Sequence, residues 1–371
     1  MKRFDFPLLL RRIVFRLMRV DLMLLGLVIT LTTIGFVTLF SAGYSFPWRI
    51  EGQIRNIAVA ASVMFVVAAT PVKWFEKSAL PLFALGCLLL AATHVAGVTV
   101  KGATRWLDVG VRIQPSEIMK LALPMMLAWY YHKRSETAAW WDHLAAFAML
   151  AVPVAFILKQ PDLGTSILVA TAGFAVIFFA GLHWKAIAVL IVGGLSMLPI
   201  VWTMMHDYQR ERVLTLLDPT SDPLGKGFHT IQALIAIGSG GLSGKGWMEG
   251  TQAHLDFIPE RTSDFLFAVY GEEFGFIGCS LLLVLFTCLV ARSFYIASQA
   301  PSTFSRLLGG ALGSIFFTYS FVNMGMVSGI LPVVGVPLPF MSYGGTALLI
   351  LGVSTGILLS ISAEVRANPN N

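Results

Sequence analysis

One aspartate stands where a long polar segment meets an apolar run. Asp264 closes the sequence PERTSD and is followed directly by FLFAVY. A carboxylate at the edge of an apolar environment is partly desolvated, which suits it to accept a proton from a hydroxyl nucleophile. Ser263 or Asp264 could instead cap the helix that follows. We take Asp264 as the candidate general base, with Glu260 and Arg261 beside it in the same segment.

Two further motifs carry ionisable residues at the starts of apolar runs. In QPSEIMK, Glu117 and Lys120 are three residues apart and share a helix face, where an ion pair is their commonest role. Ionisable residues inside a membrane span are costly, so they are also candidates for function. In QPDLGTS, Asp162 follows a proline, and helix capping alone would explain it. Both interpretations stay open for these three residues.

Apolar helices must position these residues. Of the 371 residues, 56% are hydrophobic and only 12% are charged, whereas soluble proteins contain about a quarter charged residues. We expect an all-α, polytopic membrane protein with about ten transmembrane helices and a large extracytoplasmic loop between the seventh and eighth. The expected spans lie near residues 22–41, 54–70, 79–98, 116–131, 144–158, 165–181, 185–204, 265–291, 307–329 and 345–362.

The distribution of cations orients these spans. Ten spans put both termini on one side, and the positive-inside rule assigns that side to the cytoplasm. We expect a basic cytoplasmic arm (1–20), one membrane domain (21–364) with a long outer loop (206–264), and a short cytoplasmic tail (365–371). Within the outer loop, FHTIQALIAIG (228–238) has the apolar spacing of a short helix. The cations on the assigned side include Arg16, Arg19, Lys73, Lys77, Lys133, Arg134, Lys185, Arg292, Arg306 and Arg366.

The outer segments nevertheless carry many cations. The short segment 99–115 contains Lys101, Arg105 and Arg112 but a single acid, Asp108, so local neutralisation fails there. Arginine forks suit phosphate oxygens, which indicates an anionic ligand outside. In the long loop, cations could instead pair with neighbouring acids on a solvated surface. The cations that we take as candidates for holding an anionic group are Arg105, Lys120, Arg212 and Lys245.

Several other function classes are excluded. The net charge of +6 could suggest nucleic acid, but the basic arm is better matched to the anionic inner leaflet. The three cysteines lie inside apolar runs, where a thiol behaves as a small hydrophobe. SGGLSGK resembles a nucleotide-binding loop, but Ser239 replaces its first glycine and Gly246 replaces the magnesium-binding hydroxyl residue. The sequence contains no zinc-site spacing and no serine-hydrolase elbow.

From about residue 20 to residue 362, the chain resembles the SEDS family (shape, elongation, division and sporulation), polytopic glycosyltransferases of bacterial cell-wall synthesis. GKGW, with the GTQ and PER that follow, is most similar to the elongation members rather than the division members. Thr262 and Ser263 stand where the family often has His-Thr, which leaves the aspartate in place. The matching motifs are KGATRWLDVGVRIQPSEIMK, QPDLGTS, DYQRERVLTLLDPTSDPLGKGFHTIQALIAIGSGGLSGKGW, GTQAHLDFIPERTSDFLFAVYGEEFG and NMGMVSGILPVVGVPLPFMSYGG.

The resemblance implies a reaction between two molecules of lipid II. The GlcNAc 4-hydroxyl of the acceptor attacks the anomeric carbon of the donor MurNAc, and undecaprenyl pyrophosphate leaves. A β-1,4 glycan then grows at the outer face of the bacterial cytoplasmic (inner) membrane. The resemblance implies Asp264 as the catalytic residue, with Glu117, Lys120 and Asp162 lining the cavity. A divalent cation, magnesium or manganese, could serve the pyrophosphate instead of side chains or alongside them.

The partners implied by the resemblance are lipid II, a class B penicillin-binding transpeptidase and other membrane proteins of the elongation complex, with no nucleic acid among them. Two alternatives from other classes stay open. A lipid II flippase would need charges near mid-membrane, whereas these cluster at the outer edge. A membrane scaffold for the transpeptidase would use small residues in the eighth and ninth spans for close helix packing. Those small residues are Gly275, Gly278, Gly309, Gly310 and Gly313.

Overall fold

The computed structural model describes residues 15–100, 103–108, 110, 112–134, 139–205, 207–221, 227–255 and 257–367. In this part of the chain, eight helices are long and apolar enough to cross a membrane: α2 (Leu22–Ala42), α3 (Pro47–Ala69), α4 (Val72–Ala96), α6 (Trp140–Lys159), α8 (Trp184–Met204), α12 (Leu266–Ser298), α13 (Thr303–Val327) and α14 (Gly345–Ala367). Two further helices, α5 (Pro115–Lys133) and α7 (Leu163–Phe179), complete the ten expected spans. The all-α, polytopic fold is confirmed.

Two of the expected helix starts were wrong. The spans expected from residues 54 and 79 begin earlier, at Pro47 and Val72. The first turns of α3 contain Arg49, Glu51 and Gln53, so the helix is longer than its apolar part. Pro47 occupies the first helical position, where proline is well tolerated because its missing N–H would have no partner there. Hydropathy therefore locates the membrane-crossing part of a helix, whereas the residue that the helix begins with depends on its first-turn chemistry.

The polar segments contain structure of their own. A small antiparallel sheet follows α4, with the strand order β1 (Val98–Val100), β2 (Ala103–Asp108) and β3 (Arg112–Ile113), which the sequence analysis did not predict. The expected short helix over 228–238 is confirmed as α10 (Phe228–Ser239). The remaining elements of the long loop are α9 (Asp207–Leu217), a 3₁₀ turn η1 (Pro219–Ser221) and α11 (Thr251–His254).

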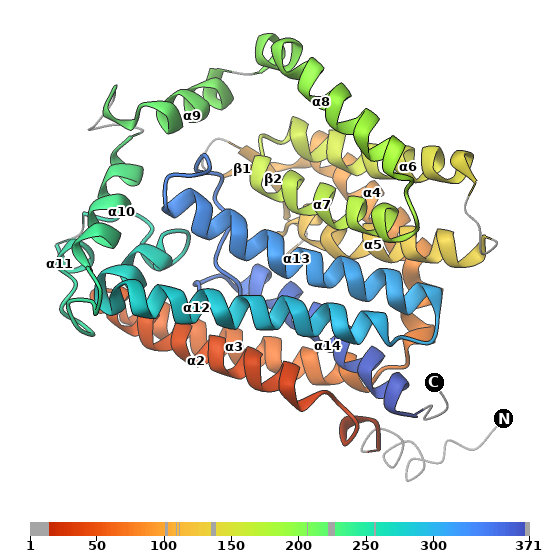
Figure 1. Cartoon of the computed structure of the whole chain (residues 1–371), viewed down its shortest axis with the longest axis horizontal. Helices are drawn as coiled ribbons and strands as arrows, with labels where there is room; N and C mark the ends of the chain where they lie inside the picture. The colour runs from red at the N-terminus through yellow and green to blue at the C-terminus, as the bar shows by residue number, and fades with distance from the viewer. Residues whose placement is uncertain are drawn as a thin grey trace.

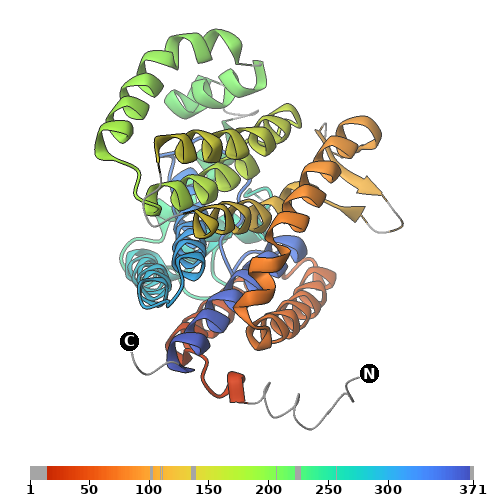
Figure 2. The same cartoon turned by 90° about the vertical axis from the view of Figure 1, so that its right-hand side faces the viewer.

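The helices run between two ends of one bundle (Figure 1). We call the end where α2 begins and α14 finishes the terminus end, and the opposite end, with the strands and α9–α11, the loop end. Helix α5 is buried along most of its length, and α13 and α14 are mostly buried. Helix α8 has no buried residue and lies at the edge of the bundle in both views (Figures 1 and 2).

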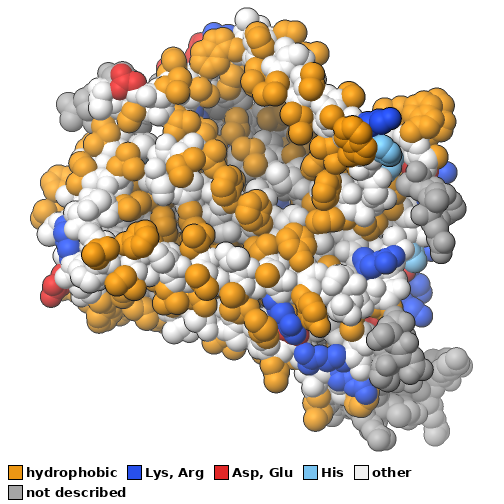
Figure 3. All heavy atoms as spheres, in the orientation of Figure 1, with side chains coloured by type: hydrophobic (Ala, Val, Ile, Leu, Met, Phe, Trp, Pro, Cys, Tyr) orange, Lys and Arg blue, Asp and Glu red, His pale blue; other side chains and the backbone are white. Residues whose placement is uncertain are grey.

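The surface agrees with a bilayer environment. Figure 3 shows hydrophobic side chains spread over the visible face of the helices, while lysines and arginines gather mainly at the terminus end. Contact of these apolar side chains with water would be unfavourable in free energy, whereas contact with lipid is not. The arrangement matches the bias that places cations at one side of a multi-pass protein.

The glycine-rich loop after α10 forms backbone hydrogen bonds with α12 at a break in that helix. At Gly275 the backbone is non-helical (φ 64°, ψ −161°), which leaves neighbouring carbonyl and amide groups without helical partners. Residues 240–246 supply those partners, so this motif has a structural role at the break. The four hydrogen bonds, at 2.9–3.1 Å, run from Lys245 N to Glu272 O, Gly246 N to Glu273 O, Phe276 N to Gly241 O, and Ile277 N to Leu242 O.

Candidate active site

Asp264 lies at the loop end, immediately before α12. Its main-chain carbonyl accepts a hydrogen bond from Asn323 Nδ2 at 2.8 Å, and the same nitrogen donates to Val336 O at 2.7 Å. Asn323 is fully buried on α13. This single amide therefore fixes the backbone of Asp264 to α13 and to the segment 331–344.

The two residues before Asp264 are held by the same segment. Ser342 Oγ donates to Ser263 O at 2.6 Å, and Tyr343 N donates to Thr262 O at 2.9 Å. The carbonyls of residues 262, 263 and 264 thus all have partners. The helix-capping alternative is not supported for Asp264, because the residue at the N-cap of α12 is Phe265 and no side chain caps this helix.

A glycine faces the Asp264 carboxylate. A Cβ built on Gly335 would lie 3.4 Å from Asp264 Oδ2, and Gly335 has a positive φ of 73°. A Cβ built on Gly164, near the start of α7, would lie 2.6 Å from Val334 O. The segment 334–336 therefore contacts both Asp264 and the start of α7. Asp264 itself is half-buried.

Asp162 organises the start of α7. Its carboxylate accepts from Thr165 N at 3.2 Å, which confirms the expected helix cap. It also accepts from Gln114 Nε2 at 3.1 Å and lies 3.5 Å from Arg105 Nη1. Asp162 is buried, whereas the Arg105 side chain is about one-third exposed. The acid that partners Arg105 thus comes from another motif, which the sequence could not indicate.

Glu117 and Lys120 form the expected ion pair. Lys120 Nζ lies 2.5 Å from Glu117 Oε1 and also donates to the hydroxyl of Tyr319 at 2.6 Å. Both charged side chains are buried. Tyr319 is fully buried on α13, and the sequence analysis did not select it. Its only signal was a phenolic hydroxyl four residues before Asn323, in a helix that also contains Ser314, Thr318 and Ser320.

Helix α13 contacts both the Glu117–Lys120 ion pair and the backbone of Asp264. Tyr319 and Asn323 are four residues apart and so share one helix face. Tyr319 contacts Lys120, and Asn323 holds Asp264. Among the described residues, several buried polar atoms in this region have no hydrogen-bond partner, which points to bound water or ligand. These atoms are Arg105 Nε, Ser116 Oγ, Glu117 Oε2, Gln160 Oε1 and Nε2, and Asn323 Oδ1.

Other candidate cations serve different contacts. Lys245 Nζ lies 2.7 Å from Glu272 Oε1, and Glu272 is fully buried. Arg261 Nε donates to Ala42 O at 2.7 Å at the end of α2. Arg212 lies on α9 at the edge of the molecule (Figure 1). None of these contacts reaches the helix face that carries Tyr319 and Asn323, so a role in binding an anionic group stays a prediction for Lys245, Arg261 and Arg212.

The remaining outer cations also differ from one another. Arg112 Nε lies 3.8 Å from Asp108 Oδ2, and both side chains are well exposed. Lys101 lies outside the described residues.

Glu260 has a positive φ of 51°, and its Oε2 accepts from Ser263 Oγ at 3.2 Å. Glu260 therefore sits in the tight turn that leads to Asp264.

A histidine next to this turn was missed by the sequence analysis. The His229 ring stacks on Phe265, with centroids 5.7 Å apart and planes at 22°. Burial lowers the pKa of His229 below its ordinary value, and the negative charge of Glu260 opposes this only in part. His229 is consequently neutral at pH 7. In the described part of the chain, no group of three or more His, Cys, Asp or Glu residues could hold a metal ion.

The fold and the site define a multi-pass membrane protein with a half-buried carboxylate at one end of its bundle. The family model for FtsW, RodA and SpoVE, described as "Cell cycle protein", matches residues 12–367. The chain therefore belongs to this family, as the resemblance predicted.

Relatives and solved structures agree with this assignment. The chain is 47% identical to peptidoglycan glycosyltransferase MrdB of Escherichia coli strain K12, covering 92% of this chain and 93% of MrdB. It is 35% identical to a probable peptidoglycan glycosyltransferase FtsW of Geobacter metallireducens, covering 95% and 96%. The crystal structure of RodA from Thermus thermophilus matches with a TM-score of 0.71 at 28% identity, covering 95% and 98%. A chain of a peptidoglycan synthase complex, in a study of polymerisation and crosslinking, matches with a TM-score of 0.81 at 31% identity, covering 93% and 98%.

Proposed function

We propose that this protein is a peptidoglycan glycosyltransferase of the cell-elongation type, which polymerises lipid II into β-1,4 glycan strands. The observation that carries the proposal is Asp264, whose backbone is held by Asn323 while its half-buried carboxylate is not used as a helix cap. A positioned carboxylate of this kind is what a hydroxyl nucleophile requires. The names of the relatives and the matched motifs support the same reaction.

Asp264 acts as the general base. It accepts the proton of the GlcNAc 4-hydroxyl on the acceptor as that oxygen bonds to the anomeric carbon of the donor MurNAc. The bond from the anomeric carbon to the pyrophosphate oxygen breaks, and undecaprenyl pyrophosphate leaves with the bonding electrons. The base must come within about 2.6–3.2 Å of the hydroxyl oxygen. The close approach of Gly335 leaves no side chain between the carboxylate and that segment.

The leaving pyrophosphate needs positive charge. Arg105 is the best-placed side chain, because it is partly exposed beside Asp162 and its Nε has no hydrogen-bond partner among the described residues. Lys120 is buried against Glu117 and Tyr319, so it supports the site from within. Magnesium is commonly held by one or two carboxylates together with substrate phosphates. A divalent cation would thus bind together with the pyrophosphate group of the substrate. Measuring the polymerisation rate with and without added metal would test whether one is needed.

The proposed setting is the bacterial cytoplasmic membrane, with both termini inside. The cations at the terminus end favour this orientation, in which Asp264 lies at the outer face. A class B penicillin-binding transpeptidase is the proposed partner, since one matched structure is of a complex that couples polymerisation to crosslinking. Two of the glycines that the scaffold alternative would use for partner packing instead contact helix α12 of this chain. A Cβ on Gly309 would meet Ala297, and one on Gly313 would meet Ser293.

Purified protein, incubated with lipid II in detergent, tests the proposal against its alternatives. A glycosyltransferase forms polymer without any membrane compartments, whereas a flippase moves lipid II only across a sealed bilayer. A scaffold forms no polymer in either preparation. Absence of polymer from folded protein, with and without added magnesium or manganese, would contradict the proposed activity.

A further inference from the structure

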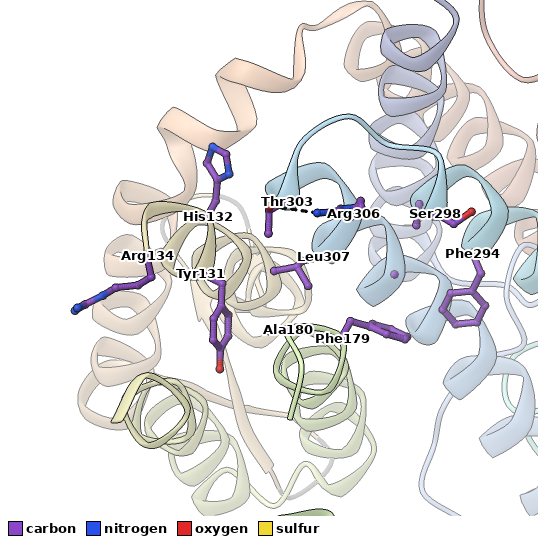
Figure 4. Close-up of a pocket in the computed structure, with 12 residues that line it drawn as sticks. Tyr131, His132, Arg134, Phe179, Ala180, Phe294, Ser298, Thr303, Arg306 and Leu307 are labelled. Carbon is purple, nitrogen blue, oxygen red and sulfur yellow. Dashed lines mark hydrogen bonds between the residues drawn. The ribbon is translucent and has the colours of Figure 1, made fainter. Parts of the chain in front are cut away.

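A cavity of about 1000 Å³ opens at the terminus end of the bundle. It lies where α5 and α7 finish, α12 finishes and α13 begins, and Figure 4 shows its lining residues. Asp264 is at the opposite end, and no residue of the proposed catalytic site lines this cavity. Ligand sites in proteins usually occupy about 300–1,000 Å³, so the cavity is large enough for a sizeable group.

One wall of the cavity is aromatic and aliphatic. Phe179 and Phe294 pack edge to face, with ring centroids 5.7 Å apart, and Leu307 lies near them (Figure 4). The Phe179 side chain is 43% exposed despite its size. An apolar surface of this kind is suited to a hydrocarbon chain rather than to a soluble, fully polar ligand.

The cavity also contains a cation without an acid. Arg306 makes one weak side-chain contact, from Nη2 to Thr303 Oγ1 at 3.5 Å, and among the described residues no carboxylate lies within ion-pair distance of it. Arg134, which also lines the cavity, is held by Asp142 at 3.4 Å and points away from the other side chains in Figure 4. Arg306 therefore keeps its charge for an external anion.

Acids near the rim do not compensate this charge. Asp142 is paired with Arg134, and Glu76 lies 3.1 Å from Lys133. The rim is thus cationic where the membrane spans end, at the depth of lipid headgroups. Basic pockets between transmembrane helices at such a level bind the phosphates of anionic lipids.

We propose that this cavity binds an anionic phospholipid from the leaflet at the terminus end. The phosphodiester group pairs with Arg306 and Thr303, and one acyl chain lies against Phe179 and Phe294. The bound lipid joins the ends of α5, α7, α12 and α13. Because α5 and α13 carry Lys120 and Tyr319 farther along, the lipid stabilises the packing of the helices that form the catalytic site. The proposal does not depend on the glycosyltransferase reaction.

Native mass spectrometry of the purified full-length protein in uncharged detergent tests the site. We expect one molecule of phosphatidylglycerol to be retained in preference to phosphatidylethanolamine. Arg306→Gln should weaken this binding about tenfold, since it removes a charge-assisted hydrogen bond. Lys185→Gln is the matched control, because Lys185 is exposed at the same end but does not line the cavity. This control should leave binding unchanged.

A second variant separates loss of the site from loss of the fold. Ser298→Trp places a bulky ring at the exposed rim while keeping every charge, and it should also prevent retention of phosphatidylglycerol. Phosphatidylglycerol should raise the thermal unfolding temperature of the parent protein but not that of Ser298→Trp. Equal retention of both lipids, or equal binding by Arg306→Gln and Lys185→Gln, would overturn the proposal. Displacement of the lipid by millimolar inorganic phosphate would overturn it too, because the site would then be one for soluble anions.

Discussion

Asn323 holds the main-chain carbonyl of Asp264 at 2.8 Å from a position 59 residues later in the chain. Because the same amide nitrogen also donates to Val336 O, one side chain joins three segments at the candidate base. Both bonds go to main-chain carbonyls, so the interaction positions the backbone of Asp264 without using its carboxylate.

Replacing Asn323 should damage catalysis more than substrate binding. Asn323→Leu removes both hydrogen bonds, and a displacement of the base by about 1 Å can cost about 100-fold in rate. We expect the turnover of lipid II to fall by about that factor while its KM changes little. Ser320→Ala is the control on α13, because its hydroxyl bonds only to carbonyls of its own helix. Equal effects of the two substitutions would remove the positioning role from Asn323.

Gly335 provides a test of space at the carboxylate. Gly335→Ala adds a Cβ at 3.4 Å from Asp264 Oδ2 and strains a positive φ by about 1–2 kcal/mol. Gly329→Ala adds the same strain at a φ of 70°, but its nearest neighbour is Leu234. Both variants should lose similar thermal stability, and only Gly335→Ala should lose part of its polymerising activity, because its methyl group takes up space in van der Waals contact with the carboxylate. Similar activity in both would show that crowding at Asp264 has no consequence.

Substitutions of Arg105 and Arg112 should differ in their effect on turnover, although both arginines lie in the same short outer segment of the sequence. Arg105→Gln removes a guanidinium that is fixed beside Asp162, and we expect turnover to fall about 10- to 100-fold, the value of a charge-assisted hydrogen bond of about 1.5–3 kcal/mol. Arg112 is exposed and 3.8 Å from its acid, so Arg112→Gln should retain most activity. Steady-state kinetics at several lipid II concentrations would compare them. Comparable losses would favour a general electrostatic effect of this segment.

Glu117 and Lys120 should be thermodynamically coupled. Glu117→Gln alone leaves a buried ammonium whose two hydrogen-bond partners, the new amide and Tyr319, carry no charge, whereas Glu117→Gln with Lys120→Met leaves no buried charge. A double-mutant cycle on the thermal unfolding of the purified protein should give a coupling of about 0.5–3 kcal/mol. Simple additivity of the two single effects would mean that Glu117 and Lys120 are not energetic partners.

Hydropathy was sufficient to locate the helices, since burial in lipid requires long apolar runs. It could not give the starts of α3 and α4 or the small sheet, because polar first turns and short strands carry little hydropathic signal. The ionisable candidates were visible because charges are expensive in apolar helices. Tyr319 and Gln114 were not, because their roles depend on partners 199 and 48 residues away in the chain. Such pairings are set by tertiary packing and leave no mark in local spacing.

The most direct test of the account is the rate at which purified Asp264→Asn protein polymerises lipid II. The amide keeps the size of the side chain, and the backbone bonds from Asn323, Ser342 and Tyr343 involve only main-chain carbonyls near residue 264. The variant should therefore insert and fold like the parent, but it cannot accept the hydroxyl proton. General-base catalysis is worth about 10² to 10⁴ in rate, so we predict that polymer becomes undetectable in a gel assay while the thermal unfolding temperature is retained. Polymer formation at the parental rate by the folded variant would contradict the assignment of Asp264 as the base.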